Sequence, residues 1–230
     1  MKKSAFIFTF IILVFTGLFA QECENYFPTE QGATWTMTNY DGKDKVESTQ
    51  KATVISSENS NGGILTTISS TSYDNKEKQT YQNTFTTLCK DGVFYIDMKN
   101  FMPPTEGDDG SQSQMQIEAA NMEIPANLAI GQKLPDSWIK ISIQVEGMPS
   151  MGGQTITMTN RTVEGFESIT TPAGTFQCVK ISWDTEMKML FNIKSKSVTW
   201  YALGVGNVRT ETYDKKGKLE GTSILTAFEK

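Results

Sequence analysis

The sequence predicts an all-β protein with one short helical lid, in which a strongly curved antiparallel sheet of about eleven strands forms a half-open barrel. Three observations lead to this fold class. Apolar and polar residues alternate with a period of two along most of the chain, and threonine and other β-branched residues crowd the alternating stretches. Turn motifs separate these stretches. A length of 230 residues, with 38% hydrophobic and 10% aromatic residues, suits one domain of barrel size.

The first 20 residues have the features of a secretory signal peptide. Lys2 and Lys3 precede an uncharged apolar run, and the small residue Ala20 lies before the expected cleavage site. The run is slightly short and wrongly flanked for a membrane span, and no later stretch approaches its length. We therefore expect an exported protein, periplasmic or extracellular, with no transmembrane segment after cleavage. Residues 21–230 are expected to form a single β-rich domain.

Charge and histidine content exclude several classes of function. Removal of residues 1–20 takes two lysines from a chain with 21 basic and 26 acidic residues, which leaves a net charge of −7. An acidic protein is repelled by phosphate backbones, so we expect no nucleic-acid partner. The chain has no histidine, which excludes a Ser-His-Asp triad, a Cys-His pair and His-ligated zinc.

Three cysteines in an oxidising compartment predict one disulfide and one free thiol. Of the three pairings, we favour Cys23–Cys89, which would tie down the N-terminus and contribute roughly 4 kcal/mol through closure of a long loop. Cys178 lies in an apolar strand pattern and is expected to be a buried free thiol. Glu22 directly before Cys23 argues against lipid anchoring at that cysteine.

The strands are predicted from the alternation itself. Between Ile181 and Lys194 the odd positions are nearly all apolar and the even ones nearly all polar, which is typical of a half-buried strand or a strand pair. The same pattern covers residues 35–40, 51–56, 64–73, 81–89, 93–98, 138–146, 155–163, 205–213 and 219–228. The four tryptophans lie within these patterns or beside them and are expected in the core.

A turn motif, Tyr-Asp-x-Lys-x-Lys, occurs three times, at residues 40–45, 73–78 and 213–218. The aspartate suits the first turn position, because its carboxylate accepts hydrogen bonds from backbone amides two residues on. The simplest interpretation is a set of solubilising hairpin ends, and the alternative is a set of basic tips that contact an acidic partner. A further turn is predicted at residues 171–174, and a bend or bulge at residues 204–206.

Residues 100–134 depart from the β pattern and predict the lid. Residues 102–111 are typical of a solvated loop. Met115, Ala119 and Met122 follow at helical spacing, which predicts a short helix over residues 113–122 that lies across the concave side of the sheet.

Methionine is abundant, with 11 residues, and such flexible side chains either fill irregular cores or line cavities for apolar ligands. Ordinary core packing is the simpler interpretation, and a cavity beneath the lid is the functional one. The candidate cavity residues are Met98, Met102, Met115, Met122, Met148, Met151, Met187, Met189 and Phe191.

No cofactor, metal site or catalytic residue is predicted. Glu106, Asp108 and Asp109 lack the spacing of a calcium loop. Met148 and Met151 have no adjacent third soft ligand for copper. No pair of acidic residues stands out for carboxylate-based hydrolysis.

Four segments, residues 23–28, 32–35, 170–178 and 200–206, resemble a secreted TapB-like family of uncharacterised β-rich proteins from Bacteroidetes. That family is in turn similar, at the level of fold, to the LolA/LolB lipoprotein carriers. The resemblance implies a half-open barrel that holds acyl chains under a short helical lid. The expected function is non-enzymatic binding of a lipid or other apolar ligand in the cell envelope. The alternatives are a structural or protein-interaction module with a filled core, which binds an envelope protein, and a carboxylate-dependent hydrolase.

Overall fold

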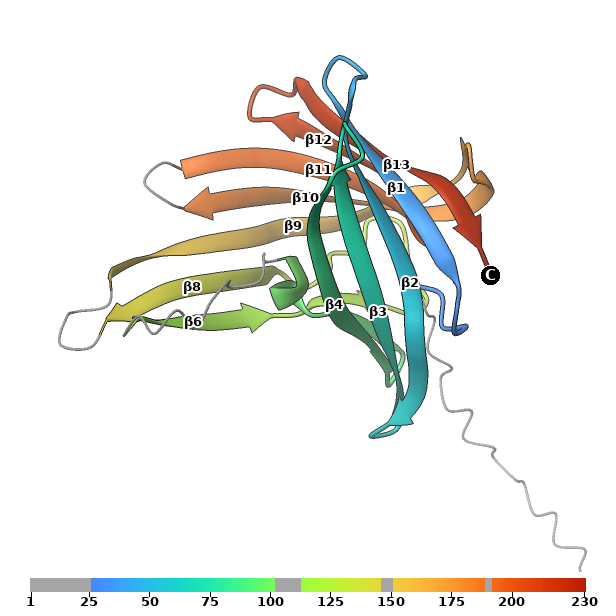
Figure 1. Ribbon diagram of the computed structural model, residues 1–230, viewed down its shortest axis with the longest axis horizontal. Helices are drawn as coiled ribbons and strands as arrows, with labels where there is room; N and C mark the ends of the chain where they lie inside the picture. Colours follow the sequence, from blue (N-terminus) through green and yellow to red (C-terminus); the bar gives the residue numbers. More distant parts are fainter. Residues whose placement is uncertain (1–25, 102–112, 146–150, 189–191) are drawn as a thin grey trace, which may run out of the picture.

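Antiparallel β-strands make up nearly all of the computed structural model, which describes residues 26–101, 113–145, 151–188 and 192–230 (Figure 1). Within these ranges the elements are β1 (Thr34–Asp41), β2 (Val46–Ser60), β3 (Gly63–Asp74), β4 (Gln79–Lys90), β5 (Val93–Ile96), the 3-10 helix η1 (Met98–Phe101), β6 (Ser113–Ala120), β7 (Met122–Pro125), β8 (Ser137–Val145), β9 (Met151–Thr171), β10 (Gly174–Lys188), β11 (Asn192–Ala202), β12 (Gly206–Asp214) and β13 (Leu219–Glu229). No helix in the described ranges is long and apolar enough to cross a membrane.

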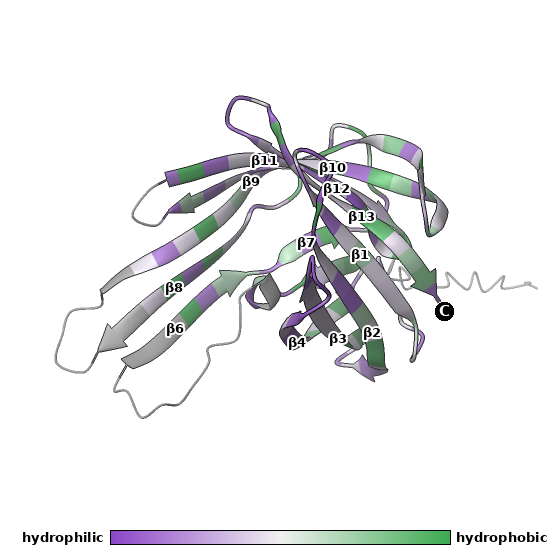
Figure 2. Ribbon diagram, turned by 45° about the horizontal axis from the view of Figure 1, so that its top comes forward, coloured by the Kyte–Doolittle hydropathy of each residue, from purple (hydrophilic) through white to green (hydrophobic). Residues whose placement is uncertain are grey.

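All thirteen described strands belong to one sheet, in the order β6-β8-β9-β10-β11-β12-β13-β1-β2-β3-β4-β5-β7. Its two ends, β6 and β7, are consecutive in the sequence and are separated only by Asn121. The chain therefore pairs with β8 before Asn121 and with β5 after it. This change of partner brings the two ends of the sheet together and curls it almost into a barrel (Figure 2). The predicted fold class is confirmed, with thirteen strands in place of about eleven.

β6 and β7 lie where the sequence predicted a helical lid, so the predicted helix over residues 113–122 is wrong. Met115, Ile117 and Ala119 satisfy helical spacing in part, but they also alternate with Gln114, Gln116 and Glu118. The period of two prevails because pairing with β8 places Ile117 opposite Ile141, and both pack in the same apolar cluster. The predicted loop at residues 102–111 lies outside the described residues.

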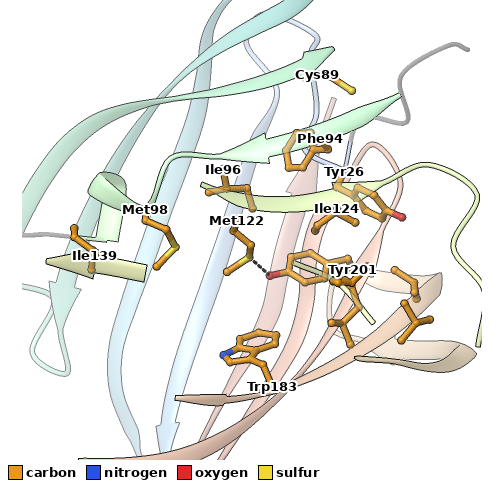
Figure 3. Packing of buried hydrophobic residues seen from close by; sticks show 14 of the residues in the cluster. Tyr26, Cys89, Phe94, Ile96, Met98, Met122, Ile124, Ile139, Trp183 and Tyr201 are labelled. Carbon is orange, nitrogen blue, oxygen red and sulfur yellow. Dashed lines mark hydrogen bonds between the residues drawn. The ribbon is translucent and has the colours of Figure 1, made fainter. Parts of the chain in front are cut away.

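Two apolar clusters hold the barrel together. The first, which we call the interior cluster, gathers side chains from β4, β5, β7, β8, β9, β10 and β11, and Figure 3 shows its centre. The second gathers side chains from β1, β2, β3 and β10 to β13. Phe27 joins them, since its ring centroid lies 5.8 Å from that of Phe94 in the first cluster and 5.7 Å from that of Trp35 in the second. Trp138 is exposed, contrary to expectation, because the alternation of β8 turns Ile139 inward.

The three Tyr-Asp-x-Lys-x-Lys turns share one geometry, as their sequences predict. In the first, the Asp41 Oδ1 atom accepts hydrogen bonds from the backbone amides of Lys43 and Lys45, at 2.8 and 2.9 Å. The equivalent bonds join Asp74 to Lys76 and Lys78, and Asp214 to Lys216 and Lys218. These amides lower the pKa of all three aspartates. The turns gather at one end of the sheet, because β12–β13, β1–β2 and β3–β4 are alternate hairpins of one continuous run (Figure 1).

Candidate functional site

The predicted methionine cavity is, where the structure describes it, part of the packed interior. Met98 and Met122 are only 1% and 2% exposed and belong to the interior cluster. Figure 3 shows Met122 facing Tyr201, whose hydroxyl donates to the Met122 Sδ atom over 4.0 Å. These two methionines fill the interior themselves, where the sequence analysis expected a ligand cavity. Core filling is the other common use of methionine.

The structure brings few of the other candidates to this place. Met187 is half-buried in β10, and Met115 and Met151 are described only by their positions in β6 and β9. The remaining candidates, Met102, Met148, Met189 and Phe191, lie outside the described residues.

The cysteines agree with expectation only in part. Cys178 is free and buried, and burial raises the pKa of its thiol to about 11. Cys89 is buried at the edge of the interior cluster. Cys23 lies outside the described residues, so the Cys23–Cys89 disulfide stays a prediction.

Arg161 on β9 is a buried cation that sequence reasoning missed. Its side chain is 1% exposed, and its Nη1 and Nη2 atoms donate to the backbone carbonyls of Pro135, at 2.7 Å, and Glu123, at 2.9 Å. Glu123 lies on β7 at one end of the sheet, and Pro135 leads into β8 near the other. Arg161 thus links the two ends of the sheet. Burial lowers the pKa of its guanidinium, and it raises that of the neighbouring Tyr201 hydroxyl to about 12.

A bulge explains why alternation did not identify Arg161. Ile156 and Met158 pack against the interior cluster, so a regular strand would turn residue 160 inward and residue 161 outward. Asn160 instead adopts a φ of 56°, and the β9–β10 register shifts there. The shift turns Arg161 and Val163 inward.

A recess of about 330 Å³ opens at the end of the barrel where β11 turns into β12. We call it the apolar mouth. It is lined by Tyr26, Asn127, Leu128, Phe166, Gln177, Cys178, Val179, Tyr201 and Leu203. Tyr26, Val179 and Tyr201 belong to the interior cluster, so the recess adjoins the packed interior. Its rim is apolar and accessible, since Phe166 and Leu203 are 56% and 54% exposed.

Strand register and the β11–β12 turn position this rim. Phe166 pairs with Val179, which pairs with Tyr201, and directly opposed residues share one face of a sheet. Leu203 enters the turn that contains Gly204 and Gly206, both with positive φ, which confirms the bend predicted there. A Cβ atom at Gly206 would lie 3.3 Å from the Phe27 ring, so glycine also lets the N-terminal segment pack against this turn.

Trp200 takes part in a polar network and offers no bare aromatic surface. Its indole N–H donates to Glu167 Oε1 over 2.6 Å, and Glu167 also lies 3.3 Å from the Lys180 ammonium. These donors lower the pKa of Glu167. Lys180 and Arg209 both lie over the indole ring. No cluster of three or more potential metal ligands occurs among the described residues.

The comparisons with known proteins place this fold. A model of the DUF3108-like family matches residues 30–225. A protein of Bacteroides fragilis with a YmcC-like fold, provisionally assigned as exported, is 22% identical with a TM-score of 0.73; the match covers 90% of this chain and 100% of that chain. A protein of Parabacteroides distasonis, provisionally assigned as a lipoprotein, is 24% identical with a TM-score of 0.75, and the match covers 91% of this chain and 100% of that chain. No curated protein matches. At such identities these structures show the fold alone.

Proposed function

This chain belongs to the DUF3108-like family, and from that premise we propose that it is a non-enzymatic binding protein of the cell envelope that takes an acyl chain or another apolar group into the apolar mouth. The apolar mouth is the observation that carries the proposal. Phe166 and Leu203 leave about half of their surface in water beside a recess of ligand size. A ligand that covers both would gain about 2 kcal/mol from their burial, because full burial of one such side chain contributes about 1.5–3 kcal/mol and about half of each is exposed.

The proposal includes export, which rests on the signal-like residues 1–20. Two fates of Cys23 remain to be separated, the predicted disulfide with Cys89 and a lipid anchor. The intact mass of the mature protein separates them, because a lipidated N-terminus is several hundred daltons heavier. The resemblance to TapB-like proteins and to LolA/LolB carriers stays a prediction, and the apolar mouth supports the proposal without it.

A protein-interaction module is the second candidate, and the filled interior favours it. The recess lies at the small end of the range for ligand pockets, about 300 to 1,000 Å³, so an apolar side chain of an envelope protein would also fit. A hydrolase gains no such support. The described carboxyl groups whose pKa is displaced, Asp41, Asp74, Glu167 and Asp214, are all displaced downward, whereas a general acid needs a raised pKa.

Native mass spectrometry tests the proposal. The mature protein is produced in a periplasm, and its mass is recorded before and after delipidation and after addition of decanoate. We expect a bound adduct that delipidation removes and decanoate restores. A protein that shows only its own mass in all three states contradicts ligand binding and leaves the interaction module.

Three variants locate the site. Phe166→Ser and Leu203→Ser should each weaken decanoate binding about fivefold or more. Ile193→Ser is the matched control, because Ile193 is 55% exposed and does not line the apolar mouth. Equal losses in all three variants would place binding elsewhere.

A further inference from the structure

The inner wall of the apolar mouth lies close to the buried guanidinium of Arg161. Tyr201 lines the mouth, and its hydroxyl points to the Met122 side chain, with 4.0 Å between the oxygen and Sδ (Figure 3). The next residue of β7, Glu123, accepts a hydrogen bond of 2.9 Å from Arg161 Nη2 on its backbone carbonyl. The hydroxyl and the guanidinium thus contact consecutive residues of one strand. In agreement with this proximity, the positive charge opposes the rise that burial causes in the pKa of Tyr201.

Two more polar side chains of the interior lie beside Arg161. The neighbours of Trp183 in β10 pair with residues 162 and 159 of β9, so Trp183 lies opposite the bulge that holds Arg161. Ser137 comes two residues after Pro135, whose carbonyl accepts a hydrogen bond of 2.7 Å from Arg161 Nη1. The side chains of Trp183 and Ser137 are both buried. Four polar side chains therefore meet in one part of the interior.

These side chains present hydrogen-bond donors that lack a strong acceptor. Among the described residues, Arg161 Nε, Trp183 Nε1 and Ser137 Oγ have no hydrogen-bond partner. The Tyr201 hydroxyl has the Met122 thioether there, and a thioether is a weak acceptor. Buried polar groups are normally paired in a folded protein, so this set indicates a ligand that accepts hydrogen bonds.

Arg161 also holds a positive charge that no adjacent anion balances. Its side chain is buried, and no carboxylate oxygen of the described residues lies within 4.0 Å of it. Glu123 and Asp136 act on its pKa only from a greater distance. Asp136 is exposed, and Glu123 alternates in β7 with the buried Met122 and Ile124. A buried cation without a paired anion is unfavourable, so an anion that reaches Arg161 is bound strongly.

We propose that the ligand of the apolar mouth is a fatty acid that enters with its carboxylate first. The carboxylate replaces Met122 Sδ as the acceptor of the Tyr201 hydroxyl, and it accepts a charge-assisted bond from Arg161 Nε. The flexible side chain of Met122 moves aside to admit it. The inference rests on the proposed function and adds the chemical class and the orientation of the ligand.

The opposite orientation would satisfy fewer groups. An ionised carboxylate only accepts hydrogen bonds, which suits the donors at the inner end of the mouth. With the tail inward, an apolar chain would lie against these donors and leave them unpaired. With the carboxylate inward, the tail lies beside Phe166 and Leu203, which are exposed at the rim. Burial of apolar surface and pairing of the donors then occur together.

Calorimetric titration of the delipidated mature protein at pH 8 compares sodium decanoate with 1-decanol. The two probes have alkyl chains of equal length, so they differ in the head group. We expect decanoate to bind about tenfold more tightly or more, because hydrogen bonds to a charged group contribute more than those to a neutral group. Equal affinities would contradict recognition of the carboxylate and leave the proposed function intact. Binding of neither probe would refute the proposed function, and this inference with it.

Tyr201→Phe tests the head-group contact without a change in packing. It should weaken decanoate binding about fivefold or more and affect 1-decanol binding less. The variant should fold as the wild type does, because the lost hydroxyl contacts only a thioether among the described residues. Tyr26→Phe is the matched control. Tyr26 lines the same mouth and packs edge-on against Tyr201 at 6.1 Å, but its hydroxyl points away from Met122 (Figure 3). Equal losses of decanoate binding in the two variants would overturn the inference.

Nuclear Overhauser contacts of the bound decanoate report its orientation. We expect the protons on C2, next to the carboxylate, to contact the Tyr201 ring, and the terminal methyl group to contact Phe166 and Leu203. The reverse set of contacts, with the methyl group at Tyr201, would overturn entry with the carboxylate first while confirming the apolar mouth as the site.

Discussion

Replacement of Gly206 by alanine tests how the N-terminal segment is held in the fold. Gly206 has a φ of 100°, and an added Cβ atom would lie 3.3 Å from two atoms of the Phe27 ring. Gly204, in the same turn, has a φ of 67°, and a Cβ atom added there would meet no atom within 4 Å. Gly204→Ala therefore carries the backbone cost alone.

The two costs can be worked out separately. A left-handed backbone costs a non-glycine residue about 1–2 kcal/mol. Crowding of a packed aromatic ring adds about 1–3 kcal/mol. We therefore expect Gly204→Ala to lower the free energy of unfolding by about 1–2 kcal/mol and Gly206→Ala by about 2–5 kcal/mol.

Guanidinium unfolding of the mature protein measures both values by linear extrapolation. The same substitutions in a Phe27→Ala background complete the cycle, and there the cost of Gly206→Ala should fall to that of Gly204→Ala. An equal cost for the two glycines in the wild-type background, or an unchanged cost for Gly206→Ala without the Phe27 ring, would refute the idea that this contact positions the segment.

Three other predictions follow from the geometry. Arg161→Met should lower the free energy of unfolding by about 2–4 kcal/mol and speed hydrogen exchange in β7, because two hydrogen bonds from a charged donor are lost. Lys140→Met on β8 is the exposed control, and similar losses in both variants would contradict the idea that Arg161 links the two ends of the sheet. The lowered pKa values of the turn aspartates stabilise the fold above the unfolded pKa of about 3.9, and this contribution is lost as pH falls through the folded values. As pH falls from 6 to 2, the urea midpoint should therefore fall less steeply for the Asp41→Asn, Asp74→Asn, Asp214→Asn triple variant than for the wild type. Parallel curves for the two proteins would contradict this prediction. Cys178 should react with Ellman's reagent at pH 8 only after unfolding. The unfolded, unreduced chain should yield one thiol if Cys23 and Cys89 are paired, two if Cys23 carries a lipid anchor, and three if neither modification is present.

The strands and turns could be predicted from the sequence because their causes are local. Alternation identifies a half-buried strand wherever the register is regular, and one aspartate holds each of the three lysine turns in the same way. The helix over residues 113–122 was wrong because the sequence there fits both periods. Pairing with β8, a strand that is separated from β6 by 16 residues, decides between them.

The candidate site was harder to predict because it depends on distant partners. Met98 and Met122 pack in the interior, and composition does not tell a filled interior from a hollow one. The apolar mouth combines Tyr26, Phe166 and Leu203, which lie far apart in the sequence. Arg161 was missed because one bulged residue, Asn160, reverses the alternation at Arg161 and Val163, before a second register shift between Val163 and Gly165.

Asn121 joins the two margins of the sheet through consecutive peptide units, whereas every other pair of neighbouring strands among the described residues is joined by a ladder of hydrogen bonds. The two edge strands are thus joined covalently at Asn121, and elsewhere only side chains such as Arg161 hold them together. Separation of the two margins would therefore break side-chain bonds and the apolar packing of the interior cluster, but none of the hydrogen-bonded ladders between the strands.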